Sequence, residues 1–550
     1  MTDIPQTFAT AVGLHQAGRL AEAGALYRQI LAVDPNHVTA MNNLAMLVPD
    51  DEAEVLLTKA VTLRPDYPDA MINLANARQA RGKLDEAVAW YERALAIRPT
   101  YVDALINLGN TLRAQDKLVD AVARYARAVE IAPEYPSAHY ALGCGLQAQA
   151  KYDEAIACFE RAVAFKPDFA EALHNIGCCY DSSQRNVEAA KFFRWALTIN
   201  PKLTGANVAM IKYLEAEGRL AEAAAFRSNV PRPIPLDIVT APKPARTMLI
   251  PGCVGPGNVP LHTILDAETT SRIQWSVDFA TDEQERSLPP FDVVFNGIGN
   301  GDLIGPSFER LSRFHERRPM LNPPATVLRT RRDLLPRLLG DIPDVVMPRV
   351  VRLRRDEMMT KDFAARLAAE GITCPMLMRP LATHGGEGMI LIETPEQLAK
   401  IGVPQSDACY FIAFYDGRAA DSHFRKYRMI FVDRKAYPYH LAISEKWLVH
   451  YYSANMLAGR KREEEQRFFA DPAAAMGARA AAAIEAIAKR MDMDFAGIDF
   501  TITPDGRVVV FEANANMSVY MSGGDEYSYK KPYVTAIVEA FRAMIERRCS

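Results

Sequence analysis

The sequence predicts a multidomain protein in which an all-α superhelix is followed by an α/β domain and then an α+β domain. Three observations lead to this fold class: prolines that recur every 34 residues in the amino-terminal part, a proline-rich stretch over 229–247, and short strand-like runs beyond it. A fixed repeat period indicates stacked repeats. Strands that alternate with helices indicate a mixed α/β fold.

Composition limits the class of protein. At 550 residues, 49% of them hydrophobic and 24% charged, the chain is long enough for several globular domains. A formal net charge of −3 points to no nucleic-acid or membrane-surface partner. No apolar run approaches the ~20 residues of a membrane span, and the first residues lack the features of a signal peptide. With eight scattered cysteines, we expect a cytoplasmic protein.

The amino-terminal part is a repeat array. The repeated prolines are Pro65, Pro99, Pro133, Pro167 and Pro201, with Pro35 preceding them by a shortened interval of 30 residues. Within each interval a small residue is followed four residues later by an aromatic one, as at Ala87 and Tyr91 or Ala155 and Phe159. A 34-residue period is typical of tetratricopeptide helix pairs. We therefore expect about seven units within residues 1–228, with the second unit shortened.

Asparagines recur on the first helix of these units. Equivalent and neighbouring positions, three and four residues apart, are occupied by Asn43, Asn73, Asn76, Asn107, Asn110 and Asn175. These spacings keep the side chains on one helical face, where amides can bind an extended peptide or protein backbone. The pattern resembles the asparagine ladder of O-linked N-acetylglucosamine transferase. Alternatively, asparagine only suits the packing of the helices; Ala141 and Ala209 interrupt the ladder.

The proline-rich residues 229–247 cannot form a helix and predict a linker. Strand-like runs then follow at 248–250, 273–277 and 292–295. They predict a small α/β domain over 248–328, ahead of a longer domain over 329–550.

A β-hairpin near the carboxyl terminus carries the candidate metal site. Asp505-Gly506 between two apolar runs predicts a two-residue turn, which places Asp499 opposite Glu512 and Asn514 on the same face. Carboxylate and amide oxygens suit Mg²⁺ that bridges to phosphates. A three-residue loop over 504–506 would slip the register by one and point the two acids to opposite faces. An ordinary hairpin with a solvated acidic face is the simpler alternative.

The segments Gly-Ile-Asp-Phe at 497–500 and Phe-Glu-Ala-Asn at 511–514 resemble the metal-binding core of ATP-grasp ligases such as glutathione synthetase and D-alanine–D-alanine ligase. This resemblance implies that Asp499, Glu512 and Asn514 hold magnesium. It also implies a pre-ATP-grasp domain over 248–328 and an ATP-grasp catalytic domain over 329–550.

The same resemblance assigns the nucleotide contacts. Arg332 and Arg379 occupy positions where the family usually has lysines that reach the phosphates. A glycine-rich loop with His384, Gly385, Gly386 and Gly388 would fold over the phosphates, because glycine backbone can approach them closely. The segment whose backbone would pair with adenine contains Phe411, Ile412, Ala413 and Phe414.

Arg428 matches the family's arginine on the transferred phosphate, and Asn516 would help it to stabilise the tetrahedral intermediate. The family expects a second arginine where this chain has Ile443. His440 and Lys446 are the candidates to replace it, and Lys446 is favoured because it keeps a permanent charge.

The resemblance implies an enzyme that joins a carboxylate to an amine with ATP and Mg²⁺, through an acylphosphate and with release of ADP. The repeats would recruit a peptide or protein, and a small amine or amino acid would be the second substrate. Two alternatives stay open. The ligase acts on free small molecules while the repeats serve assembly, or the protein is a scaffold that binds nucleotide without turnover.

Overall fold

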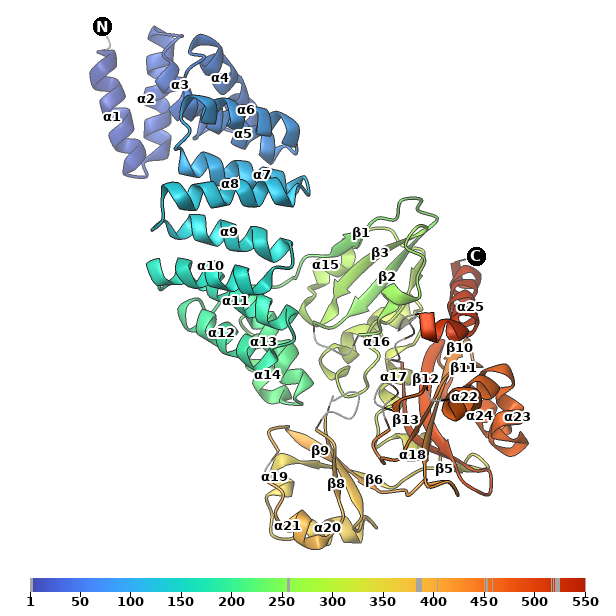
Figure 1. The fold of residues 1–550 in the computed structure, drawn as a ribbon. Coiled ribbons are helices and arrows are strands. Elements are labelled where there is room, and N and C mark those ends of the chain that lie inside the picture. The colour runs from blue at the N-terminus through green and yellow to red at the C-terminus, as the bar shows by residue number, and fades with distance from the viewer. Residues whose placement is uncertain are drawn as a thin grey trace. The chain divides into compact units, whose positions relative to one another are not determined.

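The computed structural model describes residues 3–254, 258–381, 388–402, 404–449, 451, 454–457, 459–515, 517, 519 and 525–549. Its contacts divide the chain into two compact units, Met1–Ala206 and Asn207–Ser550. Figure 1 shows the ribbon of both. The first unit is all helical, and the second is a mixed α/β unit built around three sheets.

Helix pairs follow one another along the repeat array, as the 34-residue period predicts (Figure 1). In order, they are α1 (Ile4–Gln16), α2 (Leu20–Val33), α3 (Val38–Ala45), α4 (Asp50–Leu63), α5 (Pro68–Ala80), α6 (Leu84–Ile97), α7 (Val102–Ala114), α8 (Leu118–Ile131), α9 (Pro136–Ala148), α10 (Tyr152–Phe165), α11 (Ala170–Ser182), α12 (Asn186–Ile199), α13 (Thr204–Ala216) and α14 (Leu220–Arg227). The shortened unit is visible in α3, which has 8 residues. Each repeated proline, such as Pro65 after α4, lies two residues beyond a second helix, because its ring cannot continue the helix.

The helices of a pair approach closely through one aromatic ring. Tyr125, Phe159 and Phe193 on the second helices are at most 1% exposed. Each ring lies over a glycine of the first helix: a Cβ added to Gly177 would lie 2.6 Å from the ring of Phe193. The glycine is therefore required by space, because the ring fills the volume that any side chain would need.

The last helix of the array packs inside the second compact unit. The backbone N–H of Asp407 donates to Gly218 O at 2.9 Å, and the carboxylate of Asp407 accepts from the N–H of Ala221 at 2.7 Å. Arg227 forms ion pairs with Glu215 and Asp278. These contacts explain why the division into compact units falls within α13, although the sequence places the end of the array at residue 228.

The first sheet of the second unit has the order β1-β3-β2-β4 and contains the three strands expected from the sequence. Its strands are β1 (Asp237–Val239), β2 (Arg246–Gly252), β3 (Thr270–Ser276) and β4 (Val293–Val294). β2 runs parallel to β3 and β4, whereas β1 pairs antiparallel with β3. Within the stretch 229–247, which the sequence predicts to be a linker, residues 237–239 form the strand β1. Proline breaks helices but is tolerated beside an edge strand, so this stretch forms β1.

Two sheets, antiparallel except for one strand, build the rest of the unit. One has the order β6-β9-β7-β8, and the other has the order β11-β10-β12-β13-β5 with β5 parallel to β13. Their strands are β5 (Val345–Val346), β6 (Val350–Arg354), β7 (Met376–Pro380), β8 (Ile390–Ile392), β9 (Ala408–Ala413), β10 (Phe424–Val432), β11 (Lys435–Ser444), β12 (Phe495–Ile502) and β13 (Val508–Asn514). This sheet content is the mixed α/β organisation that the sequence predicts.

Helices cover these sheets. The first sheet and the β10–β13 sheet share one core, and the β6–β9–β7–β8 sheet has a core of its own. They are η1 (Leu261–Thr263), η2 (Val277–Phe279), α15 (Asp282–Arg286), η3 (Gly305–Ser307), α16 (Phe308–Arg317), α17 (Pro324–Arg329), α18 (Leu335–Leu339), α19 (Arg355–Met358), α20 (Phe363–Ala369), α21 (Pro395–Ala399), α22 (Gly459–Ala470), α23 (Pro472–Met476), α24 (Ala478–Met491), η5 (Asp525–Lys530) and α25 (Lys531–Cys549). The ring of Phe541 in α25 contacts Phe295 and Phe495 at 5.7 and 5.5 Å between centroids. α25 therefore joins the first sheet to the β10–β13 sheet.

The β12–β13 hairpin combines the two alternatives that the sequence leaves open. The N–H of Thr503 donates to Arg507 O, and Gly506 has a φ of 84°, so the turn is the three-residue loop with a left-handed third residue. This loop pairs Phe500 with Val510. A one-residue bulge at Phe511 then shifts the register, and Asp499 lies opposite Glu512 after all.

The β10–β11 hairpin also has a one-residue bulge after its turn. Its turn residues Asp433 and Arg434 have φ values of 48° and 64°, as in the two-residue type I′ turn, which pairs Met429 with Pro438. The register then shifts by one residue. Tyr439 is the extra residue of the bulge, and Arg428 lies opposite His440. Both hairpins therefore change register by one residue partway along the strands.

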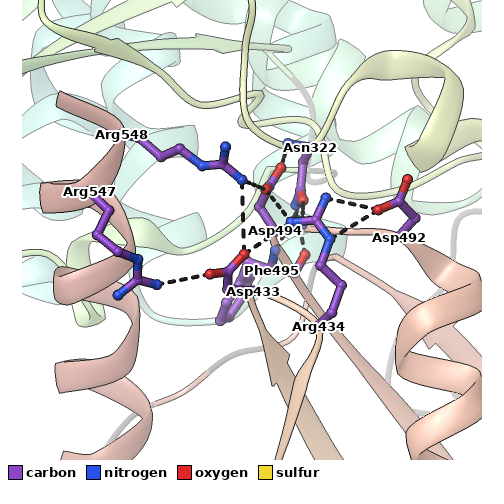
Figure 2. Close-up of polar contacts among 8 residues, drawn as sticks. All are labelled: Asn322, Asp433, Arg434, Asp492, Asp494, Phe495, Arg547 and Arg548. Atoms are coloured by element: carbon purple, nitrogen blue, oxygen red, sulfur yellow. Dashed lines mark hydrogen bonds and ion pairs between the residues drawn. The ribbon is translucent and has the colours of Figure 1, made fainter. Parts of the chain in front are cut away.

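A polar network holds the β10–β11 turn (Figure 2). Arg434 donates to Asp492 at 3.0 Å and to Asp494 at 2.7 Å, and Arg547 of α25 donates to Asp433 at 2.9 Å. Asn322 accepts from the N–H groups of Asp494 and Phe495 and donates to Phe495 O. Such contacts offset the cost of left-handed backbone at non-glycine residues, and they connect four segments distant in the sequence.

Among the helices in the described part of the chain, none combines the length and the apolar character needed to cross a bilayer.

Gly177→Ala tests the close helix approach. We expect the free energy of unfolding to fall by about 1–3 kcal/mol, because the new methyl group must displace Phe193. The matched control is Gly13→Ala, since a Cβ there meets nothing within 4 Å and alanine favours a helix. Denaturant unfolding of the full-length chain, followed by helical circular dichroism, measures both. Equal stability of the two variants would contradict the packing argument.

Candidate functional site

A cavity of about 330 Å³ in the second unit is lined by residues of both antiparallel sheets. We call it the basic cavity and define it by its charged lining: Arg332, Arg379, Arg425, Lys426, Arg428, Asp499 and Glu512. Its volume lies in the range of small-ligand sites, about 300–1,000 Å³. Five basic side chains against two carboxylates leave an excess of positive charge, which favours an anionic ligand.

Four of the polar side chains around this cavity form one row across the sheet. His440 on β11 pairs with Arg428 on β10, Arg428 pairs with Asp499 on β12, and Asp499 pairs with Glu512 on β13. Residues directly opposite on neighbouring strands place their side chains on the same face. All four line the basic cavity. We call His440, Arg428, Asp499 and Glu512 the polar row.

Asp499 is neutralised within this row. It is 4% exposed and accepts two hydrogen bonds from Arg428, Nε to Oδ1 at 2.5 Å and Nη2 to Oδ2 at 2.8 Å. Lys426 Nζ lies 3.3 Å from Oδ2. Burial opposes the charged carboxylate, but Arg428 and Lys426 outweigh it and lower the pKa of Asp499 below its usual range. Burial likewise opposes the charge of Arg428, and Asp499 raises its pKa in spite of that.

Glu512 faces the two arginines that the sequence assigns to the nucleotide. Arg332 Nη2 lies 2.7 Å from its Oε1, and Arg379 Nη1 lies 3.7 Å from its Oε2. Arg332 and Arg379 are 9% and 6% exposed. Burial, and then the neighbouring charge of Arg332, lower the pKa of Arg379 to about 10. An anion bound here would relieve the repulsion between the two guanidinium groups.

The other part of the cavity lining is apolar. Leu335, Met347, Val350 and Leu377 contribute to it together with Ile412, Ala413 and Phe414 of the predicted adenine segment. The side chain of Phe411 does not line the cavity. It is 1% exposed and packs in the core of the β6–β9–β7–β8 sheet, because alternate residues of β9 face opposite sides. The pairing of this segment's backbone with adenine stays a prediction.

Lys446, predicted as the second catalytic cation, lies away from the cavity. Lys446 lies two residues beyond the end of β11, is exposed, and does not line the cavity. Ile443 is 2% exposed and packs in the core. His440 lines the cavity instead, but burial and the charge of Arg428 hold its pKa well below the usual range, so it is uncharged near neutral pH.

Several predicted residues lie outside the described part of the chain: His384, Gly385, Gly386 and Asn516. Gly388, which closes the glycine-rich loop, has a φ of 66°, a backbone conformation that favours glycine. The next residue, Met389, lines the basic cavity.

Lys426 is a cavity residue that the sequence analysis missed. It stands two residues before Arg428 on the same strand and therefore on the same face, so alternation was the available signal. Trp447 and Tyr451 also line the cavity, but they lie in a connection after β11 for which the sequence offers no such pattern.

The predicted metal ligands come together in part. Among the described residues, no three His, Cys, Asp or Glu side chains form a metal-binding group. Asp499 and Glu512 are neighbours, and Asn514 donates to Glu512 Oε1 at 2.7 Å. The buried Oδ1 of Asn514 has no hydrogen-bond partner among the described residues. A free amide oxygen beside two carboxylates is a donor set that suits Mg²⁺.

The asparagines of the array bond to each other and to tyrosines. Asn73 donates to Asn42 at 2.9 Å and Asn107 donates to Asn76 at 3.2 Å, each across one repeat. Four of them contact a tyrosine hydroxyl, in the pairs Asn43–Tyr27, Asn76–Tyr91, Asn110–Tyr125 and Asn175–Tyr140. The ladder therefore contributes to packing between helices. Its amides are only half-buried, with Asn76 exposed, so the same face is also accessible to a ligand.

Comparisons with known proteins concern this array. Family models described as tetratricopeptide repeat match residues 66–134, 101–168 and 140–203. The amino-terminal part is thus a tetratricopeptide superhelix, a class that generally binds peptides or proteins. A search among curated proteins found no match.

Solved structures are similar to part of this chain. The crystal structure of MamA has 25% identity, covering 28% of this chain and 90% of its own, with a TM-score of 0.27. YrrB, titled a TPR protein with an unusual peptide-binding site, has 22% identity over 33% of this chain and 95% of its own, with a TM-score of 0.29. A tetratricopeptide repeat protein from Parabacteroides merdae has 16% identity over 41% of this chain and 91% of its own, with a TM-score of 0.36.

Asp499→Asn tests the electrostatics of the polar row. The substitution leaves Arg428 and Lys426 without their counter-charge, so we expect the free energy of unfolding at pH 7 to fall by about 3–5 kcal/mol. Because the folded pKa of Asp499 is lowered, its stabilisation is present above about pH 4 and lost as the pH falls through the folded value. The difference in the free energy of unfolding between wild type and Asp499→Asn should therefore be smaller at pH 3 than at pH 7.

Urea unfolding of wild type and Asp499→Asn at pH 7 and at pH 3 measures this difference in stability. Asp416→Asn is the control, because Asp416 pairs with Arg418 on the surface and its loss should barely move the midpoint. If Asp499→Asn is as stable as wild type at pH 7, or if the difference in the free energy of unfolding does not change with pH, the electrostatic account is contradicted.

Proposed function

We propose that the second unit is an ATP-grasp carboxylate–amine ligase that forms an amide bond and releases ADP. The observation that carries this proposal is the convergence of Arg332, Arg379, Arg428, Asp499 and Glu512 on one cavity. These residues come from five separate segments, each of which was assigned to nucleotide or metal from the sequence. Their convergence, next to an apolar pocket, supports a nucleotide with its base on one side and its phosphates on the other.

The phosphates would lie among the basic side chains. Arg332 and Arg379 face Glu512 from one side, and Arg428 and Lys426 face Asp499 from the other. Phosphoryl transfer requires mainly positioning of the reactants and neutralisation of charge on the phosphate oxygens. Mg²⁺, if held by Asp499, Glu512 and Asn514, would supply part of that neutralisation.

In the reaction that we propose, a carboxylate oxygen of the acid attacks the γ-phosphorus of ATP, and the bond to the β-phosphate oxygen breaks to release ADP. The nitrogen of an amine then attacks the acyl carbon, phosphate leaves, and the amine loses a proton. Arg428 would hold the transferred phosphoryl group through both steps, because it lines the basic cavity and its guanidinium group can form forked contacts with phosphate oxygens.

The repeat array would bring a peptide or protein acceptor to the ligase. This part of the proposal is supported by the tetratricopeptide class of the array and by the accessible asparagine face. Ligation of free small molecules, with the array serving assembly, is the alternative that shares the same chemistry.

A different candidate function is a scaffold that binds nucleotide without turnover. Two observations favour it: both carboxylate oxygens of Asp499 bond to Arg428, and Ile443 is buried where the family has an arginine. The presence or absence of turnover separates this candidate from the ligase.

The full-length protein should release ADP from ATP only when pooled carboxylic acids and pooled amino acids are both present. Asn514→Leu should lower the rate at least about tenfold, because the oxygen ligand is lost. Asn514→Asp, which keeps an oxygen ligand, should retain most of the activity. Raising the Mg²⁺ concentration should restore part of the rate of Asn514→Leu. ADP release that ignores the acid and the amine, or no release at all, would exclude the ligase and leave the scaffold.

Replacing Asn76 and Asn107 together by alanine tests recruitment by the array. Each hydrogen bond lost to a peptide backbone costs about 0.5–1.5 kcal/mol, so KM for peptide acceptors should rise about tenfold. KM for small acids should not change. Asn186→Ala, an exposed asparagine outside the ladder, is the control. An identical loss for peptide and small acids would argue that the array does not bind the acceptor.

A further inference from the structure

His440 owes its place in the polar row to a bulge. The turn after β10 sets a register in which Arg428 would pair with Tyr439, and His440 would then point to the opposite face. The extra residue at Tyr439 moves His440 opposite Arg428. The bulge at Phe511 does the same for Glu512 on the other side of the row. Each bulge thus replaces an aromatic residue with a polar one, and bulges of this kind are common where a side chain must be re-aimed at a site.

The imidazole of His440 has an unused polar atom. The residue is 8% exposed, and its buried Nε2 has no hydrogen-bond partner among the described residues. Its ring stacks on Tyr451, with centroids 5.1 Å apart, and both rings line the basic cavity. A buried polar atom without a partner is destabilising, so a ligand that supplies the partner restores the missing hydrogen bond.

The surroundings of His440 determine what that partner can be. Arg428 is its direct cross-strand neighbour. Asp499 acts on the ring with a negative charge, but Lys426 and Lys530 add positive charge, so positive charges outnumber negative ones around it. An anion is favoured there, whereas a proton on the ring is not. Ionised phosphate oxygens are acceptors only, so a phosphate partner requires the tautomer with hydrogen on Nε2.

We propose that His440 is an uncharged hydrogen-bond donor to the phosphoryl group transferred from ATP, and that it stands in for the second cation that is missing at Ile443. This inference rests on the proposed function of the site. Nε2 of His440 donates to a phosphoryl oxygen whose charge Arg428 neutralises from the neighbouring strand. The ring is held by stacking on Tyr451, whose hydroxyl donates to Glu465 at 2.8 Å. No proton is transferred to His440, so it contributes orientation and a dipole rather than acid–base chemistry.

The test uses full-length protein and two probes, MgADP alone and MgADP with aluminium fluoride. Aluminium fluoride mimics the phosphoryl group during its transfer. We expect His440→Leu to weaken binding of the aluminium fluoride complex about 10²-fold, as for loss of one donor to a developing charge, and to leave MgADP binding within about twofold. His440→Gln, whose amide also donates without charge, should recover most of the loss. His423→Gln is the matched control, because His423 bonds to Asp421 O and does not line the cavity.

The outcomes separate the two proposals. If wild-type protein does not bind MgADP, the nucleotide site itself is wrong and the inference falls with it. If MgADP binds but aluminium fluoride adds no affinity, or adds as much in His440→Leu as in wild type, the inference is overturned and the nucleotide site stands. If His440→Leu and His440→Gln both lose MgADP binding and thermal stability together, His440 is structural and the inference is likewise overturned.

Discussion

The functional face of the second unit depends on two shifts of register, each by a single residue. Side chains alternate across a strand, so a slip of one residue moves every following side chain to the other face of the sheet. The bulges at Tyr439 and Phe511 lie on opposite sides of the polar row. Without them, the turns would place Tyr439 beside Arg428 and Phe511 beside Asp499. For the same sequence, the backbone geometry at the two bulges therefore decides which side chains enter the polar row.

The bulges have this effect because the turns that precede them are fixed. The β10–β11 turn has two left-handed residues that are not glycine, and it is held by the network of Figure 2. That network includes residues of α25, of the segment before β12, and Asn322 from the segment before α17. A local turn is thus stabilised by parts of the chain that only the folded unit brings together.

Charge balance in the cavity follows from the polar row and its neighbours. Two carboxylates lie side by side, and each is matched by two basic side chains that approach from outside the pair. Adjacent like charges would otherwise destabilise the sheet. The surplus of positive charge that remains favours an anionic ligand, and the lining near Ile412 and Phe414 is apolar.

The sequence alone determined the repeat array, because a 34-residue period and the spacing of glycine, alanine and aromatic residues depend only on contacts between neighbouring helices. Through the resemblance to ATP-grasp ligases, it also predicted which residues of the second unit contribute to one site: Arg332, Arg379, Arg428, Asp499 and Glu512. The tertiary structure decided how they meet. The loop at 504–506 took the form that by itself would separate the two acids, and the bulge at Phe511 restored their pairing. Alternation along β9 turned Phe411 into the core, and the end of β11 left Lys446 outside the cavity while His440 entered it. Register, bulges and the assignment of faces arise from interactions between distant segments, which local sequence patterns do not contain.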